Sequence, residues 1–510
     1  MFSVLKISGV RLKLLPEHKT GNIIRNMQGE YMTEAGNNYS EKKTQLHISV
    51  RNLVEFIFRE GDIDNRSSRA MSADAMMEGT RIHRKIQGSM GKEYQAEVPL
   101  SLVVEGDLYE LTVEGRADGI FTEDGKCFVD EIKGMYRRVE LFEKPVFVHR
   151  AQAMCYAYIF ALQNNMETIG IQMTYCNLET EQTKYFREEF SFEEIKKWFD
   201  DLMEEYGKWA TFQCEMKNKR QASIKELGFP FEYRPGQKKL VSDVYRTIMR
   251  QKLLFMQAPT GVGKTISTIF PAVKAVGEEL ADRIFYLTAK TITATVAKET
   301  FALLEKNGYR AKTIQITAKE KLCPCDEMEC NPVTCPYAKG HFDRVNDAVF
   351  DLLHRCEMIE RDDILSQADR YTVCPFELCL DTASWCDNII CDYNYVFDPN
   401  VYLKRFFQEG IKGDYIFLID EAHNMVERSR QMYSAQIYKE DFLTVKRIMK
   451  EHSRSIEKAL EKCNKILLGM KRECENYTVY DTFGNMVFSF MRLMTCLLYT
   501  SPSPRDTERS

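Results

Sequence analysis

The chain has 510 residues, of which 44% are hydrophobic and 28% are charged, which excludes a globally disordered protein and leaves room for about two to four domains. Its net charge of −5 excludes a uniformly basic surface, so any contact with nucleic acid must come from a local groove. No run approaches the roughly 20 apolar residues of a membrane span, and no secretory signal is visible. We therefore expect a cytoplasmic protein with no membrane partner.

The first 215 residues divide into an extension and a domain. Residues 1–45 are polar and weakly periodic, so we assign them no fold, and the internal Met27 and Met32 leave open a later native start. Residues 46–215 mix helical and strand patterns, which predicts a compact α/β domain. The expected helices are Arg51–Glu60, Ala70–Met90 and Val148–Gln163, and the expected strands are Leu100–Val104, Tyr109–Val113 and Cys127–Ile132.

A second α/β unit follows a polar stretch, residues 216–229, that we interpret as a linker. In residues 230–319 and 381–435 strands alternate with helices, which is typical of a parallel sheet built from strand–helix–strand units. A cysteine-rich insert at residues 320–380 separates these two parts.

The remaining residues predict a small helical segment and a tail. Residues 436–495 are charged and helical in pattern, with expected helices at Phe442–Met449 and Ile456–Met470. Residues 496–510 resemble a translated sequencing adaptor, the alternative being a disordered Ser/Pro tail, and we leave them out of the fold.

Two motifs of a nucleotide-hydrolysis site occur in order in the second unit. The apolar run 253–256 leads into a glycine-containing loop that ends in Lys-Thr, the layout of a loop that cradles phosphates. The residues expected to bind the nucleotide there are Ala258, Pro259, Thr260, Gly261, Val262, Gly263, Lys264 and Thr265. Far downstream, the apolar strand Tyr415–Ile419 runs into Asp420-Glu421-Ala422-His423. The two motifs predict that the chain binds ATP with Mg²⁺.

Each polar residue of the two motifs has an expected role. Lys264 reaches the β- and γ-phosphate oxygens, and Thr265 offers its hydroxyl to Mg²⁺. Asp420 holds the magnesium through water, and Glu421 orients or deprotonates the attacking water. His423 is expected to couple hydrolysis to motion.

The insert contains the one dense group of cysteines. Four of them lie within one short stretch and a fifth follows in Val-Cys-Pro-Phe; they are Cys323, Cys325, Cys330, Cys335 and Cys374. Cytoplasmic thiols are mostly reduced, so such a group predicts metal ligation before disulfides. Spacing alone leaves zinc, an iron–sulfur cluster and ordinary buried thiols as alternatives.

The order of these motifs resembles the XPD/DinG-type iron–sulfur helicases of superfamily 2 over roughly residues 230–490. Cysteines lie between Ala289-Lys-Thr291 and the Asp-Glu-Ala-His box, and the segment Asp392–Pro399 follows them. The resemblance implies an α/β fold in which residues 230–319 and 381–435 form the first RecA-like helicase domain around an iron–sulfur insert. Residues 436–495 then form the start of a helical arch domain.

The same resemblance implies cofactors and ligands. One [4Fe–4S] cluster is bound by Cys323, Cys330, Cys335 and Cys374, with Cys325 as the rival for the second position. The lysine that precedes the first ligand in the family is replaced by Glu320. The element containing Arg234 and Gln237 resembles the adenine-reading element of such motors.

Carboxylates in the N-terminal domain predict a second site. Asp118 lies on one strand, and Glu131 and Lys133 lie on the next strand across an expected hairpin. Because residues two apart on a strand point the same way, the three side chains should share one face. Hard carboxylate oxygens can bind Mg²⁺ or Mn²⁺ there, with the lysine near the attacking water. The alternative is a pair of solvated hairpin carboxylates.

This arrangement resembles the PD-(D/E)xK nucleases, in particular their RecB-like exonuclease branch. His83, on the preceding helix, corresponds to an imidazole metal ligand of that branch. Gln152 and Tyr156, on the later helix, resemble its Gln-x-x-x-Tyr element. The resemblance implies a nuclease-like domain at residues 46–215 with Asp118, Glu131 and His83 as metal ligands and Lys133 as a catalytic residue.

Together the resemblances imply an ATP-dependent helicase that moves 5′ to 3′ on single-stranded and forked DNA, as a monomer, with an N-terminal nuclease-like domain. One rival interpretation is a single-strand exonuclease that the ATPase gates. Another is a non-catalytic DNA-binding fragment. After the Asp-Glu-Ala-His box only about ninety residues follow, too few for a second motor domain of ordinary size. We therefore expect a truncated chain with weak ATP binding and hydrolysis and no strand separation.

Overall fold

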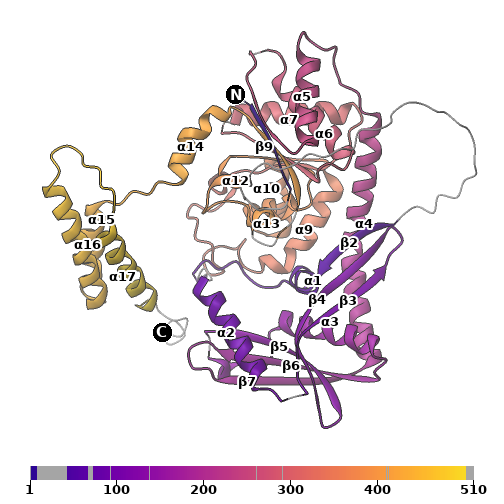
Figure 1. The fold of residues 1–510 in the computed structure, drawn as a ribbon, viewed down its shortest axis with the longest axis vertical. Helices are drawn as coiled ribbons and strands as arrows, with labels where there is room; N and C mark the ends of the chain where they lie inside the picture. Colours follow the sequence, from indigo (N-terminus) through magenta and orange to yellow (C-terminus); the bar gives the residue numbers. More distant parts are fainter. Residues whose placement is uncertain are drawn as a thin grey trace, which may run out of the picture. The chain divides into compact units, whose positions relative to one another are not determined.

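The computed structural model describes residues 2–8, 43–66 and 73–500, apart from positions 92, 137, 260, 290, 409, 410 and 412 (Figure 1). The chain divides into two compact units, Met1–Met425 and Val426–Ser510. Within the described residues no helix combines the length and the apolar character needed to cross a bilayer.

The N-terminal domain is built on a twisted mixed sheet with the strand order β2-β4-β5-β6-β7, and with β3 paired to β4. Its strands are β2 (Thr44–Ser49), β3 (Gln95–Glu105), β4 (Tyr109–Glu123), β5 (Lys126–Met135), β6 (Thr168–Asn177) and β7 (Thr183–Ser191). Its helices are α1 (Val50–Ile57), α2 (Ala73–Ser89), η1 (Val139–Leu141), α3 (Phe147–Gln163) and α4 (Phe192–Glu226). Every helix and strand that we predicted in this domain overlaps an observed one, but α1 ends at Ile57 rather than Glu60, and residues 70–72 of the second predicted helix lie outside the described residues.

Helix α3 forms the centre of this domain. It is rich in alanine, and Ala153, Cys155, Ala157 and Ile159 are fully buried. Small side chains let the helix lie close to the sheet on one side and to α4 on the other, which buries it almost all round. The sheet is thereby fixed against α3, which carries two of the predicted nuclease residues.

Helix α4 connects the N-terminal domain without a break to the second α/β domain, which we call the ATPase domain after the ATP binding that its motifs predict. Ser191 caps its first turn, and the Glu194 side chain bonds back to Ser191, so the helix start is fixed. The helix then continues for 35 residues to Glu226. The predicted linker at 216–229 is therefore wrong as a flexible segment, because its first eleven positions, 216–226, are the last turns of α4.

The C-terminal end of α4 is held against the ATPase domain by specific contacts. Arg220 forms an ion pair with Asp387, and Gln221 donates a hydrogen bond to the carbonyl of Val276 at 3.1 Å. Lys274 donates to the carbonyl of Ile224 at 2.7 Å. The polar residues that suggested a linker are thus the contacts that join the two domains, which form one compact unit up to residue 425.

The ATPase domain contains a seven-stranded sheet with the order β11-β10-β12-β9-β13-β1-β8. Its strands are β1 (Phe2–Ser8), β8 (Leu253–Met256), β9 (Arg283–Leu287), β10 (Thr313–Gln315), β11 (Met358–Ile359), β12 (Asn388–Cys391) and β13 (Asp414–Ile419). Its helices are α5 (Gln237–Met249), α6 (Lys264–Gly277), α7 (Thr291–Lys306), α8 (Lys319–Leu322), α9 (His341–Arg355), α10 (Arg361–Tyr371), α11 (Pro375–Ala383), α12 (Asn394–Phe397), α13 (Lys404–Phe407) and η2 (Ala422–Asn424).

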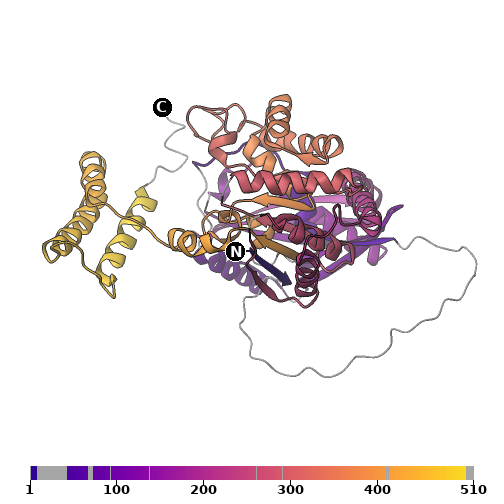
Figure 2. The ribbon, with the colours of Figure 1, turned by 90° about the horizontal axis from the view of Figure 1, so that it is seen from above.

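Strand β1 corrects two expectations. It lies between β8 and β13 and is antiparallel to both, so the sheet is not entirely parallel and residues 1–45 are not wholly without a fold (Figure 2). Residues 2–8 contain the β-branched residues Val4 and Ile7, which favour a strand. The remaining strands that pair side by side, β11, β10, β12, β9 and β13, run parallel as predicted.

The second unit is a small helical domain. It contains α15 (Lys439–Met449), α16 (Arg454–Arg472) and α17 (Gly484–Thr500), while α14 (Met425–Met432) leads into it. Both predicted helices are confirmed. The predicted tail at 496–510 begins too early, because α17 continues to Thr500 and Cys496 and Leu497 pack against the core of this unit. Residues 501–510 lie outside the described residues.

The joint between α4 and α6 gives a prediction about stability. A Cβ atom at Gly277 would lie 2.3 Å from Cγ2 of Ile224, too close to accept without movement of α4. We expect Gly277→Ala to lower the free energy of unfolding by about 1–3 kcal/mol, measured by urea denaturation. Gly228→Ala is the matched control, because no atom lies within 4 Å of its Cβ position. Equal free energies of unfolding for the two variants would contradict the close packing of α4 on α6 at this glycine.

Candidate functional site

The phosphate-binding loop has the backbone shape that its glycines were expected to allow. It leads from β8 into α6, with Lys264 as the first residue of the helix. Gly261 and Gly263 have positive φ angles of 86° and 74°, which side-chain-bearing residues rarely adopt. The free N–H groups at the start of α6 therefore face the end of a tight loop, an arrangement that binds anions. Thr260 lies outside the described residues.

Two residues upstream of the loop hold it in place. The side-chain oxygen of Gln237 accepts a hydrogen bond from the backbone of Arg234 at 3.0 Å, and its amide nitrogen donates to the carbonyl of Val262 at 3.1 Å. The Arg234 guanidinium donates to the carbonyl of Gly261. A Cβ at Gly263 would lie 2.8 Å from the Gln237 amide, so this contact requires glycine. The two predicted residues thus touch the loop, and adenine binding by them stays a prediction.

A tyrosine side chain connects the acidic motif, residues 420–423, to the phosphate-binding loop. Asp420 lies directly after β13, and its Oδ2 accepts a hydrogen bond from the hydroxyl of Tyr286 on β9 at 3.0 Å. The same hydroxyl is hydrogen-bonded to Thr265 of the loop. Parallel pairing of β9 and β13 brings Tyr286 opposite Leu418 and so places it beside the acidic motif. Two residues more than 150 positions apart in the sequence are therefore linked by one buried phenol.

Burial sets the electrostatics of this pair. Asp420 is mostly buried, which raises the pKa of its carboxyl, while the Tyr286 hydrogen bond, the Glu421 N–H and the charge of Lys264 lower it. The Tyr286 phenol has its pKa raised well above its ordinary value by burial and by Asp420. Tyr286 therefore stays protonated and donates to the carboxylate. Sequence reasoning missed Tyr286, although its place in an otherwise apolar buried strand was the available signal.

The other two polar residues of the acidic motif, Glu421 and His423, lie in the turn that follows β13. Glu421 has a positive φ of 49°, unusual for a residue with a side chain, and a carbonyl oxygen that accepts from Tyr393 at 3.3 Å. Its carboxylate lies 3.2 Å from Nδ1 of His423. The backbone is thus held in a strained shape at the residue expected to orient water, as is common at functional sites. Tyr393, a second missed residue, lies in the segment Asp392–Pro399 that carried the family resemblance.

The four predicted cluster ligands line one pocket. Cys323, Cys330, Cys335 and Cys374 share it with Lys319 and Ile63. Cys323 ends the short helix α8 and Cys374 precedes α11, so elements on both sides of the insert converge here. The Lys319 ammonium is hydrogen-bonded to the thiol of Cys330. Lys319 is thus a basic neighbour of the pocket, one position before the Glu320 that replaces the lysine of the family.

The rival ligand Cys325 lies near the same pocket. Its sulfur is 3.9 Å from that of Cys335, but its side chain does not line the pocket. Within the described residues, no three His, Cys, Asp or Glu side chains converge as they would around one metal ion. Groups of cysteine thiolates are ligands both of zinc and of iron–sulfur clusters.

The predicted nuclease residues also come together, on the β4–β5 hairpin. The Asp118 carboxylate accepts a hydrogen bond from the N–H of Ile132 at 2.7 Å and lies 3.6 Å from Nδ1 of His83. The Lys133 ammonium lies 2.6 Å from Oε1 of Glu131 and 3.3 Å from the side-chain oxygen of Gln152.

Two elements of the N-terminal domain frame this group. Helix α2 contributes His83, and α3 contributes Gln152 and Tyr156, whose side chains are hydrogen-bonded to each other. The structure thus brings the residues of the nuclease resemblance together around the β4–β5 hairpin.

Glu131 is the most perturbed carboxyl in this group. It is 1% exposed, and burial raises its pKa to about 8, although the ammonium of Lys133 opposes this. Its second oxygen, Oε2, accepts no hydrogen bond from the described residues. A buried carboxylate oxygen without a partner is costly, and a cation or a proton at this point would remove the cost. Asp118, also mostly buried, has its pKa raised by burial and lowered by His83.

Comparison with known proteins gives matches to helicases. Residues 303–442 match the family model DEAD_2. The regulator of telomere elongation helicase 1 of Rattus norvegicus is 20% identical over 248 residues, and the general transcription and DNA repair factor IIH helicase subunit XPD/RAD3 of Saccharomyces cerevisiae is 23% identical over 232 residues. Each alignment covers 39% of this chain, but only 19% and 29% of the respective relatives. A solved structure titled "Truncated XPD" is 15% identical and covers 52% of this chain and 77% of its own, with a TM-score of 0.31.

The buried Glu131 gives a prediction about pH. The folded chain holds this proton up to about pH 8, whereas an ordinary glutamate loses it near 4.5. The folded state therefore binds more protons than the unfolded state between these values, and this group's contribution to the free energy of unfolding falls as pH rises. We expect Glu131→Gln to remove this contribution in urea denaturation between pH 5 and 8. Glu93→Gln, at an exposed position of the same domain, should keep the parent's pH dependence. An identical pH dependence of stability in all three proteins would contradict a raised pKa of Glu131 in the folded state.

Proposed function

We propose that this chain is part of an ATP-driven DNA helicase that moves 5′ to 3′ along single-stranded DNA. The observation that carries the proposal is the contact of Tyr286 with both Thr265 and Asp420, because it joins the phosphate loop to the acidic motif in one site. The DEAD_2 match at residues 303–442 and the names of the two helicase relatives support the same activity. Forked DNA is the expected substrate.

The roles within the ATP site follow from its geometry. Lys264 and the N–H groups at the start of α6 receive the phosphates, and Thr265 with Asp420 can hold Mg²⁺. Tyr286 fixes the carboxylate of Asp420 by donating to one oxygen. Glu421 lies one residue further along the strained turn and can orient the attacking water.

We further propose a [4Fe–4S] cluster on Cys323, Cys330, Cys335 and Cys374. The four thiols line one pocket, and Cys325 lies outside it. The cluster, when bound, would join α8 and α11 across the insert and so brace it. Lys319 would offset part of the negative charge of the thiolates through its contact with Cys330.

A second activity, metal-dependent DNA cleavage, is favoured by the free oxygen of Glu131. Asp118, Glu131 and His83 are the groups that would hold Mg²⁺ or Mn²⁺, which when bound can activate a water. Lys133 is held 2.6 Å from Glu131, where its charge can stabilise a developing anion. Gln152 orients Lys133 from the opposite side.

The two proposed activities should be separable by mutation. We expect Lys264→Ala to remove DNA-stimulated ATP hydrolysis, because the lysine stabilises the phosphate charge, while Mn²⁺-dependent cleavage of single-stranded DNA continues. Lys133→Ala should do the reverse, lowering cleavage by about 10²-fold or more with ATP hydrolysis unchanged. Both activities are measured on the same preparations, with Lys144→Ala, an exposed residue of the N-terminal domain, as control.

Other outcomes of this experiment point to the rival functions. Cleavage that also disappears in Lys264→Ala would favour an exonuclease gated by ATP. Absence of DNA-stimulated ATP hydrolysis in the parent would favour a DNA-binding role and overturn the motor function.

The proposed cluster predicts a defined loss of iron. Anaerobically purified protein should contain about four irons per chain and absorb broadly near roughly 400 nm. Cys374→Ser should lose most of this iron, because its thiol lies in the pocket, whereas Cys356→Ser and Cys325→Ser should keep it. Stoichiometric zinc without iron would overturn the cluster, and iron loss in Cys325→Ser with retention in Cys330→Ser would exchange the second ligand.

A further inference from the structure

The segment between α1 and α2 leaves the N-terminal domain and lies on the cysteine-rich insert. We call residues 58–66 the strap. The sequence predicted a helix up to Glu60, but α1 ends at Ile57 and the strap continues in an extended form. It is the part of the N-terminal domain that reaches the proposed cluster pocket, since the side chain of Ile63 lines it.

The strap is bound to the insert mainly through its backbone. The N–H of Ile63 donates to the carbonyl of Ala338, and the N–H of Asn65 donates to that of Cys330, both at 2.9 Å. The carbonyl of Gly61 accepts from Phe342 at 3.0 Å. These bonds alternate along the strap in the manner of a strand edge, and one of them ends on a proposed ligand.

Two carboxylates add further hydrogen bonds between the strap and the insert. The N–H of Gly61 donates to the carboxylate of Asp343 at 2.7 Å, and the N–H of Gly340 donates to that of Asp62 at 2.6 Å. The strap and the insert thus each supply a carboxylate that accepts a hydrogen bond from a backbone N–H group of the other segment. Such reciprocal bonds fix the position of the strap along the insert, because a shift of one residue would break both.

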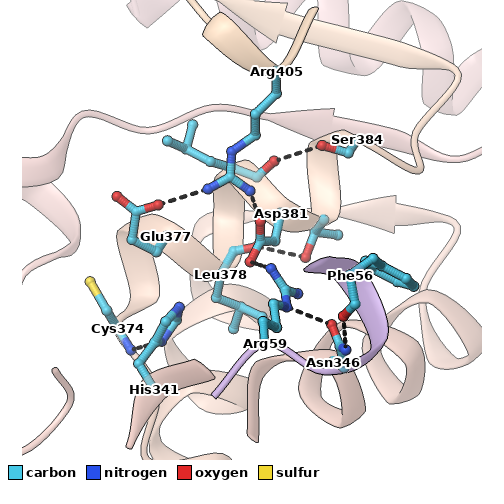
Figure 3. A network of polar contacts seen from close by, with 12 residues as sticks. Phe56, Arg59, His341, Asn346, Cys374, Glu377, Leu378, Asp381, Ser384 and Arg405 are labelled. Carbon is cyan, nitrogen blue, oxygen red and sulfur yellow. Dashed lines mark hydrogen bonds and ion pairs between the residues drawn. The ribbon is translucent and has the colours of Figure 1, made fainter. Parts of the chain in front are cut away.

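A buried ionic network anchors the beginning of the strap (Figure 3). The Arg59 guanidinium donates to Asp381 at 2.9 Å and to the side-chain oxygen of Asn346 at 2.8 Å. The amide nitrogen of Asn346 donates back to the carbonyl of Phe56 at 2.8 Å. Asp381 is also paired with Arg405, so it keeps one cation if Arg59 is removed.

The insert residues that receive the strap also contact the cluster ligands. His341, fully buried between Gly340 and Phe342, accepts a hydrogen bond on Nδ1 from the N–H of Cys374 at 3.1 Å. Cys330 and Ala338, which accept from the strap, lie on the same segment as Cys335. The strap therefore bonds directly to one proposed ligand, Cys330, and to the two neighbours of His341, which contacts a second ligand, Cys374.

We propose that the strap is a closure by which the N-terminal domain retains and shields the iron–sulfur cluster, and through which the presence of the cluster fixes the N-terminal domain on the insert. This rests on the cluster proposed above. Coupling of this kind is reciprocal: whatever the strap adds to the stability of the bound cluster, the cluster adds to the binding of the strap. The interacting partner is thus a domain of the same chain.

The first test is the rate at which iron leaves the 510-residue chain. Anaerobic protein is mixed with a ferrous chelator, and the rate constant of iron release is measured for the parent, Arg59→Ala, Ile63→Ala and Arg66→Ala. We expect release at least about fivefold faster in Arg59→Ala and Ile63→Ala, the lower end of typical coupling between sites. Arg66, whose side chain pairs with Asp64 within the strap and is 57% exposed, is the matched control and should release iron at the parent rate.

The outcomes distinguish a failure of the proposed closure from a failure of the proposed cluster. An unchanged rate in Arg59→Ala overturns the closure even if Ile63→Ala is faster, because Ile63→Ala also enlarges the pocket directly. A parent that binds no iron overturns the cluster itself, and the closure with it.

The second test needs no variant. Amide hydrogen exchange of the parent is compared with and without iron, followed at the peptide that contains Gly61, Ile63 and Asn65. We expect at least about fivefold faster exchange there after iron removal, and no change in α3, which is buried within the N-terminal domain. Equal protection of the strap in both states overturns the reciprocal coupling.

Discussion

The hydrogen bond from Tyr286 to Asp420 is the contact on which the proposed ATP site depends. It requires β9 and β13 to be parallel and adjacent, because only then does the phenol on one strand reach the carboxylate at the end of the next. The strands are apolar and buried, so their pairing is set by the core rather than by the site. A polar pair inside this core has no water to replace it, and its geometry is therefore fixed before any nucleotide binds.

Local motifs in the sequence predicted which side chains lie together at the two candidate sites. Gly261, Gly263 and Lys264 were identified because a phosphate loop needs a specific backbone, and Asp118, Glu131 and Lys133 because strand alternation places them on one face. Tyr286 and the strap were missed. Their roles come from contacts between segments more than a hundred residues apart, which no local pattern encodes.

Polarity misled the sequence interpretation in two places. Lys217 to Lys225 was read as a linker because it is charged, yet Arg220 is largely buried and paired with Asp387. Residues 1–45 were given no fold because most of them are polar, although residues 2–8 form strand β1. In both places a few residues contact a distant surface, and average composition does not reveal such contacts.

The continuity of α4 has a practical consequence for dissecting the protein. A helix of 35 residues extends roughly 50 Å, and its two halves bury side chains in different domains. Trp209 packs against Phe56 of the N-terminal domain and against Trp385 of the ATPase domain, so a cut after residue 215, the domain boundary suggested by the sequence, would leave it on the N-terminal fragment without Trp385. If both fragments contain the whole of α4, each of them keeps Trp209 together with one of its two aromatic partners. The useful places to divide the chain are therefore outside this helix, as in the design of split proteins.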